Sequence, residues 1–267
     1  MNTTRRTNAA LLPTIEAISE MGGRENNEDA HGSWQDGQSA CCVVADGAGG
    51  HGGGEVASRI VVDTVLADIA QAVPAEAPLS ASRLVRMLLH ANEEILEAQE
   101  SGAPLRDMRS TAALLMLDGV RGTAIWAHCG DSRLYCLRGG EIIARTRDHS
   151  MVQSMIDARL ISPEEALRHP KRSVLYAALG TEGDLAIDPC TQPLRLQSGD
   201  AFLLCTDGLW EFVDDARLTE LLRRSATPRQ WLQALAAEVN QGAPDSHDNF
   251  TAVTVWVGTP EITVLIR

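Results

Sequence analysis

Four aspartates stand at the ends of short apolar segments of the chain, where strands are expected to end. Asp46, Asp131 and Asp207 each follow such a segment, and Asp248 comes just before another. If these segments lie side by side in a β core, the four carboxylates meet at one edge of it. Clustered carboxylate oxygens are the ligands that Mg²⁺ and Mn²⁺ prefer. Each position taken alone also fits an ordinary turn, because aspartate followed by glycine is a common turn composition.

A charged segment near the N-terminus adds an arginine and two more carboxylates. Arg24 comes shortly before the adjacent residues Glu28 and Asp29. A guanidinium beside a metal cluster suits a phosphate, because its planar fork binds two oxygens while metal ions hold or activate water. Taken alone, this segment is typical of a solvated loop.

The segment after Asp46 is rich in glycine but is not a nucleotide-binding loop. Residues 47–54 lack the Lys-Ser/Thr ending of such a loop, because Glu55 follows Gly54. Glycines that bring the backbone close to a metal and then open a helix fit better, with His51 as a loop histidine. The sequence contains neither a Gly-x-Ser-x-Gly elbow nor a cysteine and an arginine with exactly five residues between them. Metal-activated water is the mechanism that remains.

Periodicity indicates the elements that must position these residues. Apolar runs bounded by turn residues predict strands over 15–19, 41–45, 112–117, 124–128, 133–137, 141–145, 201–206 and 251–257. Helical periodicity predicts helices over 55–71, 84–98, 151–160, 163–168, 215–224 and 228–240, with Ser80 or Ser82 capping the second. Gly139-Gly140 signals a hairpin. Strand pairs joined by tight turns favour antiparallel sheets with helices packed outside.

Composition limits the classes of partner and compartment. The chain of 267 residues has 36 acidic and 23 basic side chains, a formal net charge of −13, which disfavours nucleic acid and anionic membranes. Bound cations can reverse the sign locally, so a small phosphorylated substrate fits. We find no signal peptide and no apolar run near the roughly 18 residues of a membrane helix. Six cysteines without a CxxC pair are expected to be reduced and buried. A cytoplasmic protein of one domain is expected.

Taken in order, the motifs resemble those of the metal-dependent protein serine/threonine phosphatases of type 2C. They are residues 23–24 (GR), 28–29 (ED), 44–50 (VADGAGG), 130–133 (GDSR), 148–150 (DHS), 178–180 (ALG), 206–210 (TDGLW) and 248–251 (DNFT). The resemblance runs from about residue 14 to 257 and is closer to bacterial than to animal members. It implies an α+β fold, a four-layer α-β-β-α sandwich with two central antiparallel sheets flanked by helices. Residues 1–267 would form one phosphatase domain, with a flap beside the active site at about 148–176.

The resemblance also implies a metal centre with two Mn²⁺ or Mg²⁺ ions. Asp46 would bridge the two ions, and the carbonyl of Gly47 would bind one of them. Asp207 and Asp248 would complete the other.

Four further residues complete the implied site. Glu28 and Asp29 would hold metal-bound waters or a metal ion. Asp131 matches the position of a third metal ion. Arg24 would bind the substrate phosphate and would be catalytic together with Asp46.

The function expected from this resemblance is hydrolysis of phosphoserine and phosphothreonine in proteins by a metal-activated water. The partners would be phosphorylated proteins and a bacterial serine/threonine kinase whose action the enzyme opposes, and a monomer is expected. Two alternatives remain at this point. A non-catalytic phosphoprotein-binding relative would keep the fold, and a metal-dependent nuclease would share the carboxylates, although the net charge disfavours it.

Two departures from the family pattern concern the neighbourhood of Asp46. Ala48 stands where animal members have a histidine proposed as a general acid and bacterial members often have methionine. Residues 108–111 read Met-Arg-Ser-Thr in place of the usual Met-Gly-Thr-Thr, so Arg109 places a cation where a glycine normally sits.

Overall fold

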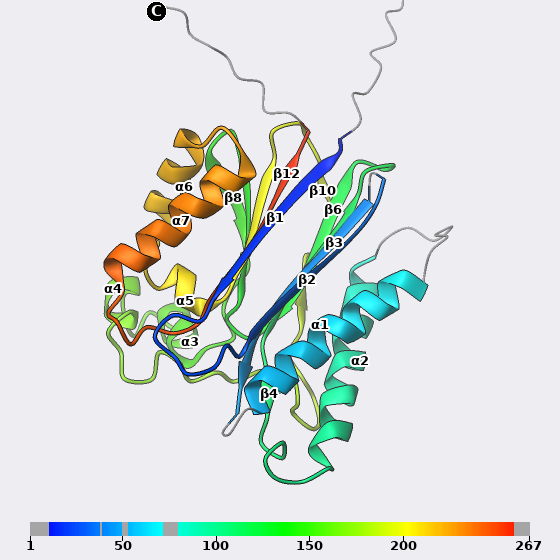
Figure 1. Ribbon diagram of the computed structural model, residues 1–267, viewed down its shortest axis with the longest axis vertical. Helices are drawn as coiled ribbons and strands as arrows, with labels where there is room; N and C mark the ends of the chain where they lie inside the picture. Colours follow the sequence, from blue (N-terminus) through cyan, green and yellow to red (C-terminus); the bar gives the residue numbers. More distant parts are fainter. Residues whose placement is uncertain (1–10, 38, 50–52, 72–79, 259–267) are drawn as a thin grey trace, which may run out of the picture.

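Two antiparallel sheets form the centre of the molecule (Figure 1). The computed structural model describes residues 11–37, 39–49, 53–71 and 80–258. One sheet has the order β1-β12-β11-β7-β8, with β1 Pro13–Glu20, β12 Phe250–Val257, β11 Ala201–Cys205, β7 Arg133–Arg138 and β8 Glu141–Arg145. The other has the order β10-β6-β5-β3-β2, with β10 Leu194–Arg195, β6 Thr123–Cys129, β5 Ala112–Asp118, β3 Ser39–Ala48 and β2 Asp29–Asp36. Two short strands, β4 Arg109–Ser110 and β9 Asp188–Pro189, pair with β3 and β6.

Alternate side chains of the central strands belong to different cores. In β3, Cys41 and Val43 pack in the core shared with the helices on that side. Cys42 and Val44 point the other way, into the core between the two sheets. This period of two explains why the strand is apolar along its length, since both of its faces are buried.

Helices cover the outer face of each sheet. The long helices α1 (Gly53–Gln71) and α2 (Ala81–Gln99) lie on the sheet that contains β3, and α6 (Asp215–Arg224) and α7 (Pro228–Gly242) lie on the sheet that contains β1 (Figure 1). The expected four-layer α-β-β-α sandwich is therefore confirmed. In the part of the chain that the structure describes, no helix has the length and apolarity needed to cross a membrane.

Three short helices gather at one end of the sandwich, in the lower left of Figure 1. They are α3 (Met151–Asp157), α4 (Pro163–Ala166) and α5 (Asp207–Trp210). Side chains fix the starts of the first two: Ser150 accepts a hydrogen bond from the backbone of Gln153, and Ser162 forms a capping box with Glu165. The same end of the sheets carries the aspartates singled out in the sequence.

The predicted elements are present, with differences at their ends. The Gly139-Gly140 hairpin is confirmed, with φ of 59° and 80° between β7 and β8. The helix predicted over 151–160 ends at Asp157, because Arg159 adopts a left-handed φ of 56° that a helix cannot continue. Ser80 is the N-cap residue of α2, but its side chain makes no capping hydrogen bond.

Candidate metal centre

Both sheets contribute carboxylates to one site. Asp46 on β3 lies directly opposite Asp29 on β2 in the strand register. From the other sheet, Asp207 follows β11 as the first residue of α5, and Asp248 comes two residues before β12. Asp131, in the turn after β6, completes this group. The carboxyl group of Asp46 interacts electrostatically with those of the other four aspartates. We call these five residues together with Glu28 the carboxylate centre.

The like charges of the carboxylate centre repel one another. Burial raises the pKa of Asp46 well above its usual range, and the nearby charge of Asp207 raises it further. Burial likewise raises the pKa of Asp207, followed by the charge of Asp248. A hydrogen bond with the side chain of Asp46 partly offsets this rise in the pKa of Asp207. Hard oxygen donors that converge in this way are the ligands that Mg²⁺ and Mn²⁺ prefer.

Hydrogen bonds fix the backbone of Asp46 on both sides. Its N–H donates to Oγ1 of Thr111 at 3.0 Å, and its carbonyl accepts from the N–H of Thr111 at 2.8 Å. Oγ1 of Thr111 also lies 2.7 Å from Oγ of Ser132. The position of the Asp46 carboxylate is therefore set by the β core rather than by a free loop.

The glycines after Asp46 allow a close approach of helix and strand. The N–H of Gly47 donates to the carbonyl of Glu28 at 3.0 Å, and a Cβ at Gly47 would lie 1.9 Å from the carbonyl oxygen of Gly54. A Cβ at Gly54 would meet the carboxyl group of Glu28 at 2.6 Å. Glycine at both positions lets the start of α1 rest on β3 with the Glu28 carboxylate beside it.

A buried threonine supports Asp29. Oγ1 of Thr206 donates to Oδ2 of Asp29 at 2.9 Å and accepts from the N–H of Thr251 at 2.9 Å. Asp29 is only 8% exposed, and burial raises its pKa against the lowering effect of this hydrogen bond. Thr206 thus links the two sheets beneath the carboxylate centre.

Asn249 connects the loop that carries Arg24 to Asp248. Its side chain accepts from the N–H of Glu28 at 2.8 Å and donates to the carbonyl oxygens of Met21 and Asn26 at 2.7 and 2.9 Å. Nη2 of Arg24 donates to Oδ2 of Asp248 at 2.6 Å. Arg24 is more than half exposed, so its remaining donors are available to a ligand above the carboxylates.

Asp131 is held at the base of the predicted flap. It is 6% exposed, and its carbonyl accepts from Nε1 of Trp210 at 2.9 Å. Arg133 stacks on the ring of Trp210 at 3.6 Å and forms a two-point ion pair with Asp148, at 2.9 and 2.7 Å. Burial raises the pKa of Asp131 well above its usual range, and the charge of Asp207 adds to the effect.

Glu211 also belongs to this region, although the sequence analysis did not select it. It follows Asp207 by one helical turn, and this spacing of two carboxylates on a helix is a signal that could have found it. Burial, and then the charge of Asp207, raises its pKa to about 7. Arg172 pairs with it at 2.8 Å. The two residues line a cavity of about 540 Å³ between α3 and α4 on one side and α5 and α6 on the other.

A second group of metal-type donors does not suit a cation. Donor atoms of His128, His149 and Asp188 lie within 4.8 Å of one another. Nδ1 of His149 accepts from the N–H of Gly130 at 3.2 Å, and burial lowers the pKa of His149, so the neutral ring carries its proton on Nε2. Both ring nitrogens of His128 face backbone carbonyl oxygens, those of Asp188 and Arg147. A metal needs a free lone pair on each ligand nitrogen, so these contacts favour a structural network.

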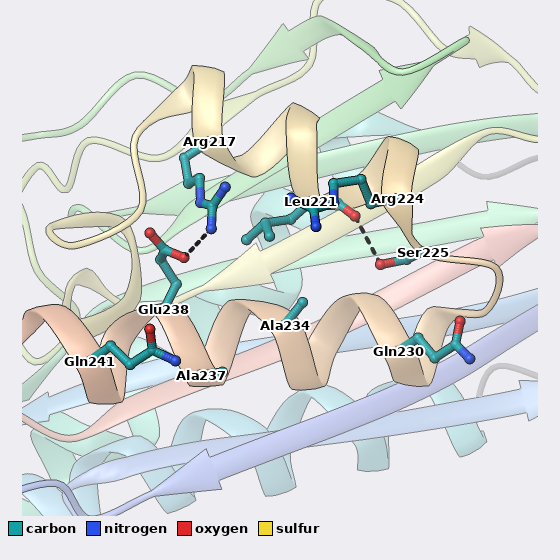
Figure 2. A pocket seen from close by; sticks show the side chains of 9 residues that line it. All are labelled: Arg217, Leu221, Arg224, Ser225, Gln230, Ala234, Ala237, Glu238 and Gln241. Carbon is teal, nitrogen blue, oxygen red and sulfur yellow. Dashed lines mark hydrogen bonds and ion pairs between the residues drawn. The ribbon is translucent and has the colours of Figure 1, made fainter.

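A hollow between α6 and α7 is separate from the carboxylate centre (Figure 2). Figure 2 shows Arg217 from α6 pointing toward Glu238 on α7, and the two are 2.7 Å apart. None of its lining residues belongs to the carboxylate centre or to the predicted flap. It therefore offers nothing to the chemistry of the site.

The structure brings the sequence-predicted site residues to one place. Gly47 lies in β3 next to Asp46, and Arg24 is bonded to a member of the carboxylate centre. Their roles as ligands and phosphate binder stay predictions. Ala48 is exposed at this end of β3 and has no proton to donate. His51 lies outside the described residues.

Comparisons with known proteins agree with the fold. The sequence profile of the protein phosphatase 2C family matches residues 19–240. The serine/threonine phosphatase Stp of Listeria innocua is 32% identical over 235 residues, which cover 87% of this chain and 90% of that protein.

Solved structures give the same relationship. The serine/threonine phosphatase PstP/Ppp of Mycobacterium tuberculosis has a TM-score of 0.77 at 31% identity, over 93% of this chain and 100% of that one. A catalytic domain of PstP in complex with two manganese ions has a TM-score of 0.73 at 30% identity, over 92% and 99%. The family match and these identities extend over most of the length of the chain. The chain therefore belongs to the protein phosphatase 2C family of metal-dependent protein serine/threonine phosphatases.

Proposed function

We propose that this chain hydrolyses phosphoserine and phosphothreonine in proteins at the carboxylate centre. The observation that supports the proposal most is the convergence of buried and half-buried, mutually repelling carboxylates from both sheets beside an exposed arginine. Asp46 and the Gly47 carbonyl, with Asp207 and Asp248, would hold two Mn²⁺ or Mg²⁺ ions. Such ions supply Lewis-acid polarisation of the phosphate and a water acidic enough to attack at neutral pH.

The remaining members of the carboxylate centre have supporting roles in this proposal. Glu28 and Asp29 would accept hydrogen bonds from water at the centre or coordinate an ion directly. Asp131, next to Asp207, would offer a position for a third ion. Oγ1 of Thr206 orients the side chain of Asp29, and Nε1 of Trp210 fixes the backbone of Asp131.

Arg24 would bind the phosphate. Its guanidinium has donors free besides the one bonded to Asp248, and two parallel N–H groups match two phosphate oxygens. Charge that develops on these oxygens in the transition state would strengthen this contact. The departing serine or threonine oxygen would take its proton from solvent water, since Ala48 carries none.

Hydrolysis of a phosphothreonine peptide tests the proposal directly. We expect turnover that requires Mn²⁺ or Mg²⁺, is abolished by chelation, and falls by at least about a hundredfold in Asp207→Ala, because a ligand is lost. Asp63→Ala, on the exposed face of α1, is the matched control and should keep full activity. Turnover that survives in Asp207→Ala would refute the assignment, and peptide binding without turnover would indicate a non-catalytic relative.

The biological setting that we propose is narrower than the family membership. The substrates would be phosphoproteins of a bacterial serine/threonine kinase, and the chain would act as a monomer with residues 148–176 as a flap beside the site. The six cysteines are free and buried, which suits the reducing cytoplasm that we propose as its location. Co-expression with a candidate kinase, followed by phosphoproteomics of the deletion strain, tests the pairing. Fractionation tests the location, and light scattering tests the monomer.

A further inference from the structure

Arg109 stands at the outer edge of the carboxylate centre, on the strand next to Asp46. In the register of β3 and β4, Ser110 pairs with Gly47 and Arg109 pairs with Ala48. Residues directly opposite each other in an antiparallel pair lie on the same face of the sheet. Arg109 therefore shares a face with Ala48.

That face leads from the core to the carboxylate centre. Cys42 and Val44 point into the core between the sheets, and with a period of two Asp46 and then Ala48 follow on the same side of β3. Asp46 is where the carboxylates meet, and Ala48 is the next position outward. Diagonal neighbours across a strand pair are roughly 7–8 Å apart, so the Cβ of Arg109 lies about that far from Asp46.

The position of Arg109 is fixed by its surroundings. On the side away from β3, the N–H of Ser110 donates to the carbonyl of Leu179 at 3.0 Å, and the N–H of Leu179 donates back at 2.7 Å. Nη1 of Arg109 donates to the carbonyl of Met108 at 2.8 Å, and Nε2 of Gln99 donates to the same oxygen at 2.9 Å. The backbone and one corner of the guanidinium are thus held in place, which reduces the entropy lost on binding a ligand.

The charge of Arg109 is not matched by a carboxylate. Three other arginines beside the carboxylate centre form ion pairs: Arg24 with Asp248, Arg133 with Asp148, and Arg172 with Glu211. Arg109 forms no ion pair with any residue that the structure describes, and its one hydrogen-bond acceptor is the Met108 carbonyl. It is partly buried, so an incoming anion would be only partly screened by water.

We propose that Arg109 is a specificity-determining residue that binds a second anionic group of the substrate, close in sequence to the phosphorylated residue. This inference rests on the proposed function, since it places the phosphate at the carboxylate centre and Arg24. A carboxylate of aspartate or glutamate matches the planar fork of the guanidinium in two-point geometry. A second phosphorylated side chain has the same chemistry.

Peptide kinetics with charge-matched variants test this role. The substrates are a neutral phosphothreonine peptide, versions with one glutamate at each of the three positions on either side, versions with phosphoserine there, and phenyl phosphate. We expect Arg109→Gln to raise KM for at least one glutamate peptide roughly fivefold, with kcat unchanged, and to leave the neutral peptide and phenyl phosphate within twofold. Arg109→Lys should retain part of the preference. A larger increase in KM for a peptide with a second phosphoserine than for the matching glutamate peptide would identify a phosphorylated side chain as the group that Arg109 binds.

The control is Arg86→Gln, which removes the same charge from the exposed face of α2 and should leave every ratio of glutamate to neutral peptide unchanged. An equal change for neutral and acidic peptides in Arg109→Gln, or the same ratios in wild type and variant, would overturn the inference. Failure of the wild type to hydrolyse any of these substrates would overturn the proposed function, and this inference with it.

Discussion

Replacing Asp207 with asparagine should stabilise the metal-free protein and weaken its response to metal. Asp207 is the neighbouring charge that raises the pKa of Asp46 most. Two unit charges 4 Å apart repel by about 4 kcal/mol at an effective dielectric constant of 20. Because both side chains are partly exposed, solvent screens this repulsion, and we expect about 1–3 kcal/mol of relief from the substitution at pH 8.

This relief converts into a measurable change of melting temperature. For a chain of this size, 1 kcal/mol corresponds to about 2–4 °C, so Asp207→Asn should melt about 3–8 °C above the wild type in chelator. With Mn²⁺ at 100 to 1,000 times its dissociation constant, the wild type should gain about 2.7–4.1 kcal/mol. The variant, which lacks a ligand, should gain much less. The difference between the two melting temperatures should therefore shrink or change sign as the metal concentration rises.

Differential scanning calorimetry in chelator and across an Mn²⁺ titration measures both effects. Asp63→Asn, a change on the exposed face of α1 that breaks no ion pair with a residue that the structure describes, should match the wild type in both conditions. If Asp207→Asn melts below the wild type in chelator, the carboxylates do not repel as the geometry implies. If its metal-induced shift equals that of the wild type, Asp207 is not a ligand.

Three further predictions concern pH and the supports of the site. The pKa of Asp29 is raised to about 7 in the folded metal-free protein, whereas an aspartate in the unfolded chain loses its proton near pH 4. The free energy of unfolding should therefore fall as the pH rises from about 4 to about 7.5. Urea unfolding in chelator would measure this fall, and Mn²⁺ should suppress it. Thr206→Val should lower the free energy of unfolding in urea by about 2–3 kcal/mol, because the carboxylate of Asp29 and the N–H of Thr251 each lose a buried hydrogen-bond partner. Thr206→Ser should keep both hydrogen bonds. Equal losses in the two variants would contradict this reasoning. Asp200 is fully buried and paired with Arg138 at the end of β11 that lies away from the site. Replacing it with asparagine should lower the free energy of unfolding by about 3 kcal/mol. The kcat on a phosphopeptide, measured below the melting transition, should not change.

The sequence was most informative where strands are buried on both faces. β5 and β12 are buried at every position, which produces the continuous apolar runs that predicted them. β2 was not predicted, because it is an edge strand with the composition of a polar segment. Its place beside β3 depends on contacts with α1: a Cβ at Gly32 would lie 2.7 Å from the side chains of Val62 and Leu66. No local pattern carries that information.

The sequence predicted which carboxylates form the candidate site better than it predicted the contacts that hold them in place. Aspartates at strand ends are visible in the sequence because turn and ligand positions coincide there. The partner of Arg24 is Asp248, at the other end of the chain, and only the pairing of β1 with β12 brings the two together. The spacing of Glu211 one helical turn after Asp207 was the only sequence signal for it, because the burial that raises its pKa comes from the tertiary fold and is not recorded in a motif.

The net charge of −13 and the placement of arginines near the site have to be considered together. An acidic protein repels a phosphorylated, acidic peptide at long range, and the carboxylate centre alone would repel its phosphate most strongly. Divalent cations at the centre reverse that sign over a few ångströms only, because salt screens charge beyond about 8 Å. Anionic groups of the substrate that fall outside this radius therefore need cations of their own at the edge of the site. Arg24 pairs with Asp248 and would bind the phosphate in the proposed function, and Arg172 pairs with Glu211. Arg109, which forms no ion pair with any residue that the structure describes, stands on the strand next to Asp46 in the sheet and is placed to meet that need.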